Sequence, residues 1–282
     1  MESLQMVFLG MSDNSRMGKI WNSSLCRLSS KSERLVSKMG SIIKAEHLKF
    51  KRTFGKILPV IAPTITLLLV LALTGGLADA FPAGVWNWWY ATLLPGTLAV
   101  MCYLSITKDR KNRYYNLKSL PVSGRKLVLG KMIYLALGLF AANVIIFLGA
   151  TIGGAIFGST IPVGGAAIAT ILLTLSYLWE IPVYLFLSAR FGMFADIFIC
   201  MVISIGGVAT LADKGSWWLC PSAIPVRLMC PTLGLLPNGL PIPAGSELWS
   251  TNVILPGIML SLAWFVVCAI LFAIWFEKME VK

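Results

Sequence analysis

Six long apolar runs, separated by shorter polar segments, limit what this chain can fold into more than any other feature of its sequence. The runs cover residues 58–77, 88–106, 133–157, 166–189, 197–211 and 253–276. A helix of about 20 apolar residues crosses a bilayer, whereas the strands of a membrane barrel are about half as long and alternate in polarity. Only 13% of the residues are charged, against about a quarter in soluble domains. The runs therefore predict an all-α integral membrane protein with six transmembrane helices.

Three further predictions concern the length of one run, the prolines within the runs and the absence of a signal peptide. The fifth run is short, and we expect its helix to continue into residues 215–218. Several runs contain prolines, among them Pro59, Pro63 and Pro182; membrane helices tolerate proline, so none is assigned a gating role. The first run starts too far along the chain for a cleaved signal peptide, and none is expected.

The basic residues predict how the helices are oriented. Of the 24 lysines and arginines, only Lys214 and Arg227 fall on the side of the membrane opposite to the two termini. Because lysine and arginine are retained on the cytoplasmic side during insertion, both termini are predicted to be cytoplasmic, in a multi-pass protein of the cell membrane. The net charge of +12 then follows from topology and from attraction to anionic lipid, and no nucleic-acid partner is expected.

Two regions of the chain differ in composition. Residues 1–40 are polar and serine-rich, as is typical of a disordered cytoplasmic tail. Alternatively, translation starts at Met39 and the preceding residues are an upstream extension; a mass measurement on the native protein would decide between the two. Residues 41–282 are predicted to form a single six-span domain.

This domain is predicted to begin with a helix that lies on the membrane. Ile43, His47, Phe50 and Phe54 fall on one helical face, with basic residues around the remainder. Such a pattern predicts an N-terminal amphipathic helix in the cytoplasmic interface. A simple cluster of charges beside the membrane is the alternative.

Motifs for catalysis are missing from the sequence. No G-x-x-x-x-G-K-[ST] motif occurs, so the chain is not expected to bind ATP in a P-loop by itself. His47 is the single histidine, which excludes HExxH metal sites and histidine-based triads. We therefore expect no enzyme activity, catalytic residue, metal ligand or bound cofactor in this chain. Cys220 and Cys230 share the predicted outer side and form either a disulfide or two free thiols.

Polar residues inside the apolar runs are pointers to function. Glu180 lies in the inner half of the fourth run, where it would contact a cationic substrate or a partner subunit. Hydrogen bonding to a neighbouring helix is the structural alternative. Asn143, in the third run, is expected to hydrogen-bond between helices.

The segment between the fifth and sixth runs, residues 212–252, is unusually rich in proline and tryptophan. Its prolines exclude a long regular helix, and its leucines would be exposed in a plain surface loop. We therefore expect short re-entrant segments at the outer leaflet, where tryptophan is favoured. Trp217, Trp218 and Arg227 are the candidates there for contact with a substrate or a second subunit.

The polar connection between the second and third runs reads YYNLKSLPVSGRKLVLGK, residues 114–131. It predicts a short cytosolic helix that stops at Pro121, followed by a new helix with Ser123 as its cap. A cytosolic partner that grips such a segment would move two membrane helices together. The alternative is a turn whose basic residues only enforce the topology.

Four segments in order resemble a known family: KAEHLKFKRTF (44–54), WNWWYATLLPG (86–96), YNLKSLPV (115–122) and IPVRLMCPTLGLLPNGLP (224–241). The third resembles the coupling region of type-2 ABC exporter permeases. Together the four resemble the lantibiotic-protection (immunity) permeases of the MutE/EpiE family, from about Lys44 to the C-terminus. The sister MutG/EpiG family shares the Trp-Trp segment, and the fourth segment favours MutE/EpiE.

The resemblance implies the permease subunit of an ATP-driven exporter that expels a lantibiotic or related antimicrobial peptide from the membrane, giving self-protection to a Gram-positive bacterium. Its partners would be two copies of a cytosolic ABC ATPase, which bind ATP and Mg, and a second permease of the MutG/EpiG type. The residues implied to couple to the ATPase are Tyr115, Asn116, Leu117, Lys118, Ser119, Leu120, Pro121 and Val122. The alternatives are a general ABC drug or peptide exporter and an immunity protein that only sequesters its peptide.

Overall fold

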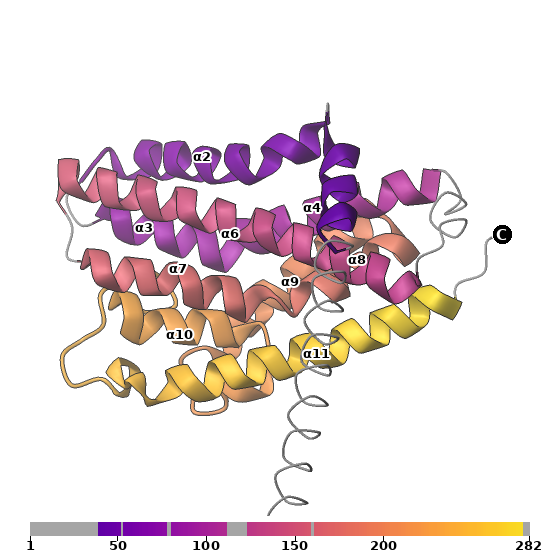
Figure 1. Ribbon diagram of the computed structural model, residues 1–282. Helices are drawn as coiled ribbons and strands as arrows, with labels where there is room; N and C mark the ends of the chain where they lie inside the picture. The colour runs from indigo at the N-terminus through magenta and orange to yellow at the C-terminus, as the bar shows by residue number, and fades with distance from the viewer. Residues whose placement is uncertain (1–38, 52, 78–79, 112–122, 159–160, 279–282) are drawn as a thin grey trace, which may run out of the picture. The chain divides into compact units, whose positions relative to one another are not determined.

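A computed structural model of the chain describes residues 39–51, 53–77, 80–111, 123–158 and 161–278 (Figure 1). Its larger compact unit begins at Glu46. A helix covers residues 39–50. The remaining elements are α2 (Phe54–Thr74), α3 (Ala80–Trp88), the π-helix η1 (Trp89–Leu93), α4 (Leu94–Lys111), α6 (Gly124–Phe157), α7 (Val163–Tyr177), α8 (Glu180–Phe191), α9 (Met193–Leu211), η2 (Trp217–Leu219), α10 (Ala223–Leu233), η3 (Glu247–Trp249), η4 (Thr251–Val253) and α11 (Ile254–Lys278).

The described part of the chain is helical and contains no strand. Five helical segments are long and apolar enough to cross a membrane, and the pair α7–α8, which is bent by 45°, raises the number to six if it counts as one span. The predicted all-α membrane fold is therefore confirmed, with one of its six spans broken in the middle.

The fifth span differs from the prediction at both ends. The helix α9 starts at Met193, four residues before the apolar run, and ends at Leu211. The predicted continuation into residues 215–218 is wrong, because the chain turns after Leu211 and Trp217 starts the separate helix η2. Gly192, with φ of 86°, makes the sharp turn from α8 that allows the earlier start.

The break between α7 and α8 has a local cause. Pro182 has no N–H and leaves the carbonyl of Leu178 without its regular helical donor, so the chain bends at that turn. The N–H of Ile181 donates to that carbonyl instead, at 3.2 Å. The two halves then pack differently: α7 lies against α6 and α10, and α8 against α4 and α9.

The N-terminal helix is shorter than predicted. It ends at Phe50, because the backbone of Thr53 is extended and serves as the N-cap position of α2. Phe54 therefore does not share a face with Phe50; it begins α2 and is 54% exposed, whereas Phe50 is buried and stacks on Tyr134 at a ring distance of 5.1 Å. The location of this helix at a membrane interface stays a prediction.

The second span contains a π-helical turn, η1, between α3 and α4. Trp89, in this turn, donates its ring N–H to Asn143 Oδ1 at 2.8 Å, and Asn143 Nδ2 donates to Thr174 Oγ1 at 2.9 Å. The amide thus joins η1, α6 and α7 inside the bundle. Asn143 is the interhelical hydrogen-bonding residue that was predicted.

Small residues let α6 approach its neighbours closely. A Cβ atom on Gly149 would lie 2.4 Å from Leu67 of α2, and one on Gly153 would lie 2.0 Å from Phe81 of α3. This four-residue spacing of glycines is typical of tightly packed membrane helices. At its start, α6 extends back to Gly124, with Ser123 at the N-cap position as predicted, although the serine side chain makes no capping bond.

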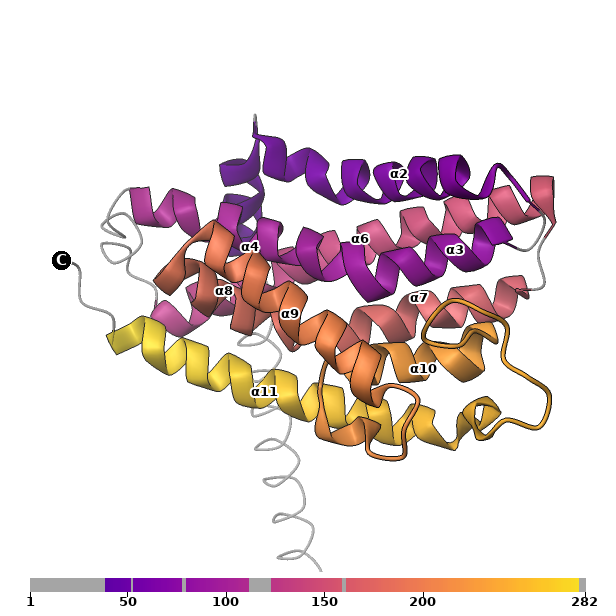
Figure 2. The same cartoon turned by 180° about the vertical axis from the view of Figure 1, so that it is seen from behind.

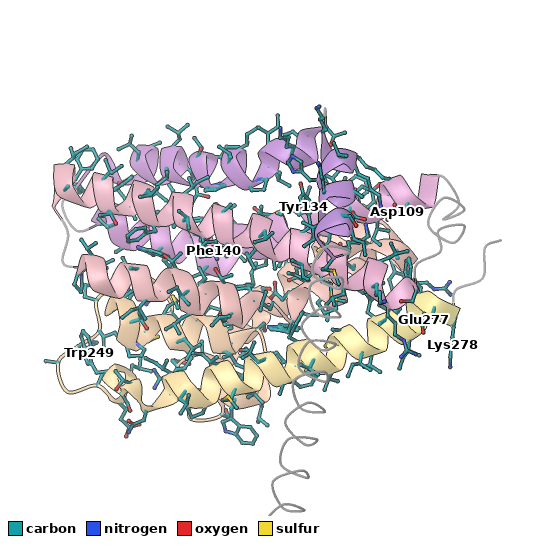
Figure 3. The ribbon with its side chains drawn as sticks, in the orientation of Figure 1. Asp109, Tyr134, Phe140, Trp249, Glu277 and Lys278 are labelled. Atoms are coloured by element: carbon teal, nitrogen blue, oxygen red, sulfur yellow. The ribbon has the colours of Figure 1, made fainter. Side chains whose placement is uncertain are left out.

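The larger unit has two ends that matter for function (Figure 3). Asp109, Glu277 and Lys278 lie at one end, and Trp249 lies at the other. We call these the Asp109 end and the Trp249 end. The short helix α10 and the loops around it lie toward the Trp249 end, between α9 and α11 (Figure 2).

Candidate functional site

Four ionisable side chains meet at the Asp109 end, and we call them the ion cluster. Lys131 Nζ lies 3.1 Å from Glu46 Oε2 and 2.8 Å from Asp109 Oδ2. Lys49 Nζ lies 2.6 Å from Glu46 Oε1 and 2.9 Å from Asp109 Oδ1. Each lysine therefore bridges the same two carboxylates.

The ion cluster is closed to solvent around Lys131, which is only 1% exposed. Its ammonium also donates to the hydroxyl of Ser105 at 2.8 Å and to the carbonyl of the same residue at 3.2 Å. A buried ammonium is tolerated when opposite charges and hydrogen bonds replace its hydration, and here two carboxylates and Ser105 do so.

The ion cluster joins three elements, two of which flank the predicted coupling segment. Glu46 and Lys49 come from the helix at 39–50, Asp109 from the last turn of α4 and Lys131 from α6. The predicted coupling residues, 115–122, lie outside the described residues. The chain enters and leaves that segment through α4 and α6, and the ion cluster fastens these two helices together.

A second ion pair connects the start of α6 to the end of α11. Arg125 Nε lies 3.0 Å from Glu277 Oε2, and the two side chains are 69% and 33% exposed. Exposed ion pairs contribute little to stability because water and salt screen them. The pair therefore adds little to the stability of the contact between the two helix ends.

Glu180 is the first residue of α8, at the break in the bent span, and is 1% exposed. Within the described residues neither of its oxygens accepts a hydrogen bond of regular geometry, although the hydroxyl of Tyr184 in the next turn is its polar neighbour. A second buried carboxylate, Asp196 of α9, accepts hydrogen bonds from the Ser188 hydroxyl and, at 3.3 Å, from the Cys200 thiol. Among the described residues, no hydrogen bond of regular geometry joins Glu180 to a neighbouring helix, and both predicted roles of Glu180 stay predictions.

At the Trp249 end, an open pocket of about 1080 Å³ lies between the end of α9, α10 and the loops that follow. Its lining contains both Trp217 and Arg227, which the sequence suggested separately as contact residues. Trp218 lies outside the lining and is 54% exposed. Lys214, Asp213 and Glu247 add one positive and two negative charges to the lining.

Arg227 has a different environment from Lys131. It is 6% exposed and its guanidinium donates to the carbonyl oxygens of Leu248 at 3.1 Å and Glu247 at 3.4 Å. These bonds hold η3 against α10. No carboxylate pairs with Arg227 among the residues that the structure describes.

Cys220 and Cys230 are free thiols in this structure, and a disulfide between them stays a prediction. Cys220 Sγ lies 3.1 Å from Ser222 Oγ, and Cys230 donates to the carbonyl of Val226 at 3.4 Å. Burial raises the pKa of the Cys230 thiol to about 11, so the thiol is protonated at neutral pH. Over the described ranges, no group of three or more metal-binding side chains occurs.

A family profile described as ABC-2 family transporter protein matches residues 42–207, more than half of the chain. The chain belongs to the ABC-2 transporter family. No curated protein and no solved structure matches it. Members of this family are membrane permeases of transporters, so the chain is a transport permease, and its family implies an ABC ATPase as partner.

The range that matches the ABC-2 family contains the ion cluster and ends before the residues that line the pocket. The ion cluster and the connection at 112–122 lie inside the matched range, which ends at Gly207 of α9. The residues that line the pocket begin at Val208. In this permease the ion cluster therefore belongs to the part shared with the family, and the pocket lies in the part beyond it.

The ion cluster was not predicted from the sequence. Lys131 was counted only as one of the basic residues that determine topology. A signal was nevertheless present: Glu46 and Asp109 are the single acidic residues in the basic stretches 39–56 and 107–131. A lone acid among many bases next to a membrane span is a candidate partner for a buried lysine.

Proposed function

We propose that this ABC-2 permease is a subunit of an ATP-driven exporter that expels a lantibiotic or related antimicrobial peptide and so protects the cell that makes it. The observation that carries the proposal is the ion cluster, which fastens the two helices on either side of the predicted coupling residues. The lantibiotic class rests on the four segments that resemble the MutE/EpiE permeases.

The ion cluster supports a mechanical role for the segment that it flanks. An ATPase that binds Tyr115–Val122 pulls on α4 and α6 together, because separating them would expose Lys131 and its two buried carboxylates. Breaking such a buried charge group costs several kcal/mol, about 3–5 when one partner is removed. The helices therefore move as one body with residues 46–50.

The proposed complex has further parts. Two copies of the ATPase bind ATP and Mg on the cytoplasmic side, and a second permease of the MutG/EpiG type completes the membrane unit. Both termini and the Asp109 end are cytoplasmic in this arrangement, as the positions of the basic residues favour. The Trp249 end then faces the outer leaflet.

A peptide in the outer leaflet would meet exposed tryptophans at the Trp249 end. Trp218 is 54% exposed and Trp249 is 47% exposed, and tryptophan is favoured at the membrane boundary. Glu180, buried at the bend of the fourth span, is proposed to act later, on a cationic group of the peptide or of a partner subunit.

Replacing Leu120 and Pro121 with two glycines tests the proposal. We expect the variant to reach the membrane and to assemble with its ATPase, whose ATP hydrolysis continues while protection against the peptide is lost. The matched control replaces Pro243 and Ala244, in an exposed loop at the Trp249 end, with the same two glycines. Unchanged resistance in the Leu120-Pro121 variant would contradict the coupling role.

Family membership alone also favours a general drug or peptide exporter. Resistance to a panel of unrelated hydrophobic drugs, conferred by this permease with its ATPase, would support that candidate over lantibiotic protection. Loss of protection when the ATPase is inactivated would exclude a permease that only sequesters the peptide.

A further inference from the structure

We propose that the pocket at the Trp249 end binds the headgroup of a zwitterionic aminophospholipid, and that one acyl chain of this lipid lies along α9. The pocket is lined by residues of this chain, so lipid binding can be measured on the permease without a peptide. The proposal therefore goes beyond peptide export and is tested independently of it.

The pocket lies where a spanning helix leaves the apolar part of the membrane. Val208 and Ala209, in the last turns of α9, belong to its lining, and the helix ends at Leu211. Trp217 lies in the lining, and the exposed Trp218 follows it. Tryptophan rings favour the level of the lipid headgroups, so the pocket opens at the depth of the phosphate and its substituent.

The charges that line the pocket match those of an aminophospholipid. The guanidinium of Arg227 has five N–H donors; two bind backbone carbonyl oxygens, and the Cys230 sulfur is a further hydrogen-bond partner. Phosphate oxygens suit the remaining donors, and Lys214 adds a second positive charge to the same pocket. Asp213 and Glu247 are acceptors for a primary ammonium. A headgroup with one phosphate and one ammonium satisfies both sets.

An exposed apolar stripe continues from the pocket along α9. Ala209, Ile205, Val202, Phe198 and Phe194 recur at intervals of three or four residues and therefore share one face of the helix. The stripe is about 22 Å long at 1.5 Å per residue, which exceeds half of a hydrocarbon core of about 30 Å. An acyl chain attached to a headgroup in the pocket has this surface to follow. Other spans such as α2 and α11 also expose apolar side chains, but the stripe on α9 is continuous with the pocket, because Ala209 belongs to both.

The proposal changes the roles of two residues. Arg227 and Trp217, which the sequence suggested as contacts for a substrate or a second subunit, become contacts for a lipid headgroup. Trp218 remains outside the pocket and available to other ligands.

Native mass spectrometry of the full-length permease in detergent tests the proposal. The delipidated protein is titrated with the palmitoyl-oleoyl forms of phosphatidylethanolamine, phosphatidylglycerol and phosphatidylcholine. We expect phosphatidylethanolamine to bind most tightly and Arg227→Gln to weaken it about tenfold, the loss expected for charge-assisted hydrogen bonds. The matched control is Arg190→Gln, an exposed arginine at the end of α8, which should leave binding unchanged.

Two further variants keep the test decisive if Arg227→Gln fails to fold. Ala209→Trp places a large ring in the pocket lining while Arg227 itself is kept, and it should reduce phosphatidylethanolamine binding. The double change Asp213→Asn and Glu247→Gln should abolish the preference for phosphatidylethanolamine over phosphatidylglycerol. Equal binding of all three lipids to the unaltered protein, or unchanged binding in Ala209→Trp, would overturn the proposal. So would loss of binding of a cationic lanthipeptide in Ala209→Trp with lipid binding intact, because the pocket would then be a peptide site.

Discussion

The two ends of the bundle each hold a buried basic side chain, but they neutralise it in different ways. Lys131 is enclosed by two carboxylates that a second lysine also binds. Arg227 lies in an open pocket, where its hydrogen-bond partners are two backbone carbonyl oxygens and the Cys230 sulfur, none of them a carboxylate. A group that is fully paired inside the protein has no capacity left for a ligand, and it holds helices together. A group whose charge is unpaired keeps that capacity.

Replacing Lys131 should have the largest effect and would test the first half of this comparison. Lys131→Met leaves two buried carboxylates with Lys49 as their remaining cation, and we expect the free energy of unfolding to fall by about 3 kcal/mol. The midpoint of thermal unfolding in detergent measures the loss. Lys126→Met, an exposed lysine of the same helix, is the control.

If Lys131→Met and Lys126→Met unfold at the same temperature, the ion cluster does not hold α4 and α6 together. A triple variant sharpens the result: Glu46→Gln and Asp109→Asn, combined with Lys131→Met, remove all three charges. We expect it to recover part of the lost stability, because neutral amides no longer leave unpaired buried charges.

Replacing Arg227 should cost less stability. Arg227→Gln loses two charge-assisted hydrogen bonds to the backbone but strands no carboxylate, so we expect a loss of about 2 kcal/mol. Thermal unfolding of Arg227→Gln beside Arg190→Gln measures it. A loss as large as that of Lys131→Met would mean that Arg227 has a buried counter-charge, and the contrast between the two ends would disappear.

Asn143 lies in the middle of the bundle and provides an uncharged reference. Asn143→Leu removes the acceptor of Trp89 and the donor to Thr174, and interhelical hydrogen bonds in membranes contribute about 1 kcal/mol. We expect a loss of that size in thermal unfolding, with Asn252→Leu at an exposed position as control. A loss of stability larger than that of Arg227→Gln would show that the charge of a buried group does not determine how much it contributes to stability at these sites.

The exposed pair at the Asp109 end should matter least. Glu277→Gln breaks the contact with Arg125, and we expect a loss below about 0.5 kcal/mol that vanishes at high salt, because exposed pairs are screened. Unfolding at low and high ionic strength gives the measurement. A loss of stability that persists in high salt would show that the Arg125–Glu277 pair is shielded from solvent in the way that the ion cluster is.

The sequence predicted those features that depend on composition over a long window or on a single residue type. The apolar runs located the spans, because about 20 apolar residues are needed to cross a bilayer. Asn143 was identified because an amide in an apolar helix needs a polar partner from another helix. Ser123 marked the position where α6 starts because serine favours the N-cap.

Features that depend on which helices meet could not be predicted in this way. The ion cluster unites residues 85 positions apart, and the pocket brings Arg227 beside a turn that follows α9. The early end of the first helix depends on the extended backbone of Thr53, a residue type compatible with either conformation. The sequence showed that Pro182 lies in the fourth run, but not that the helix is bent there by 45° or that its two halves pack against different neighbours.

The bend also determines where a displacement travels. The ion cluster fastens α4, and α4 packs against α8, which begins at Glu180 directly after the break. Movement of the Asp109 end therefore reaches the two halves of the broken span by separate routes: α8 through α4, and α7 through α6, which carries Lys131. The 45° bend between the halves is the place where a difference between the two displacements would be absorbed, because Pro182 already interrupts the helical hydrogen bonding there.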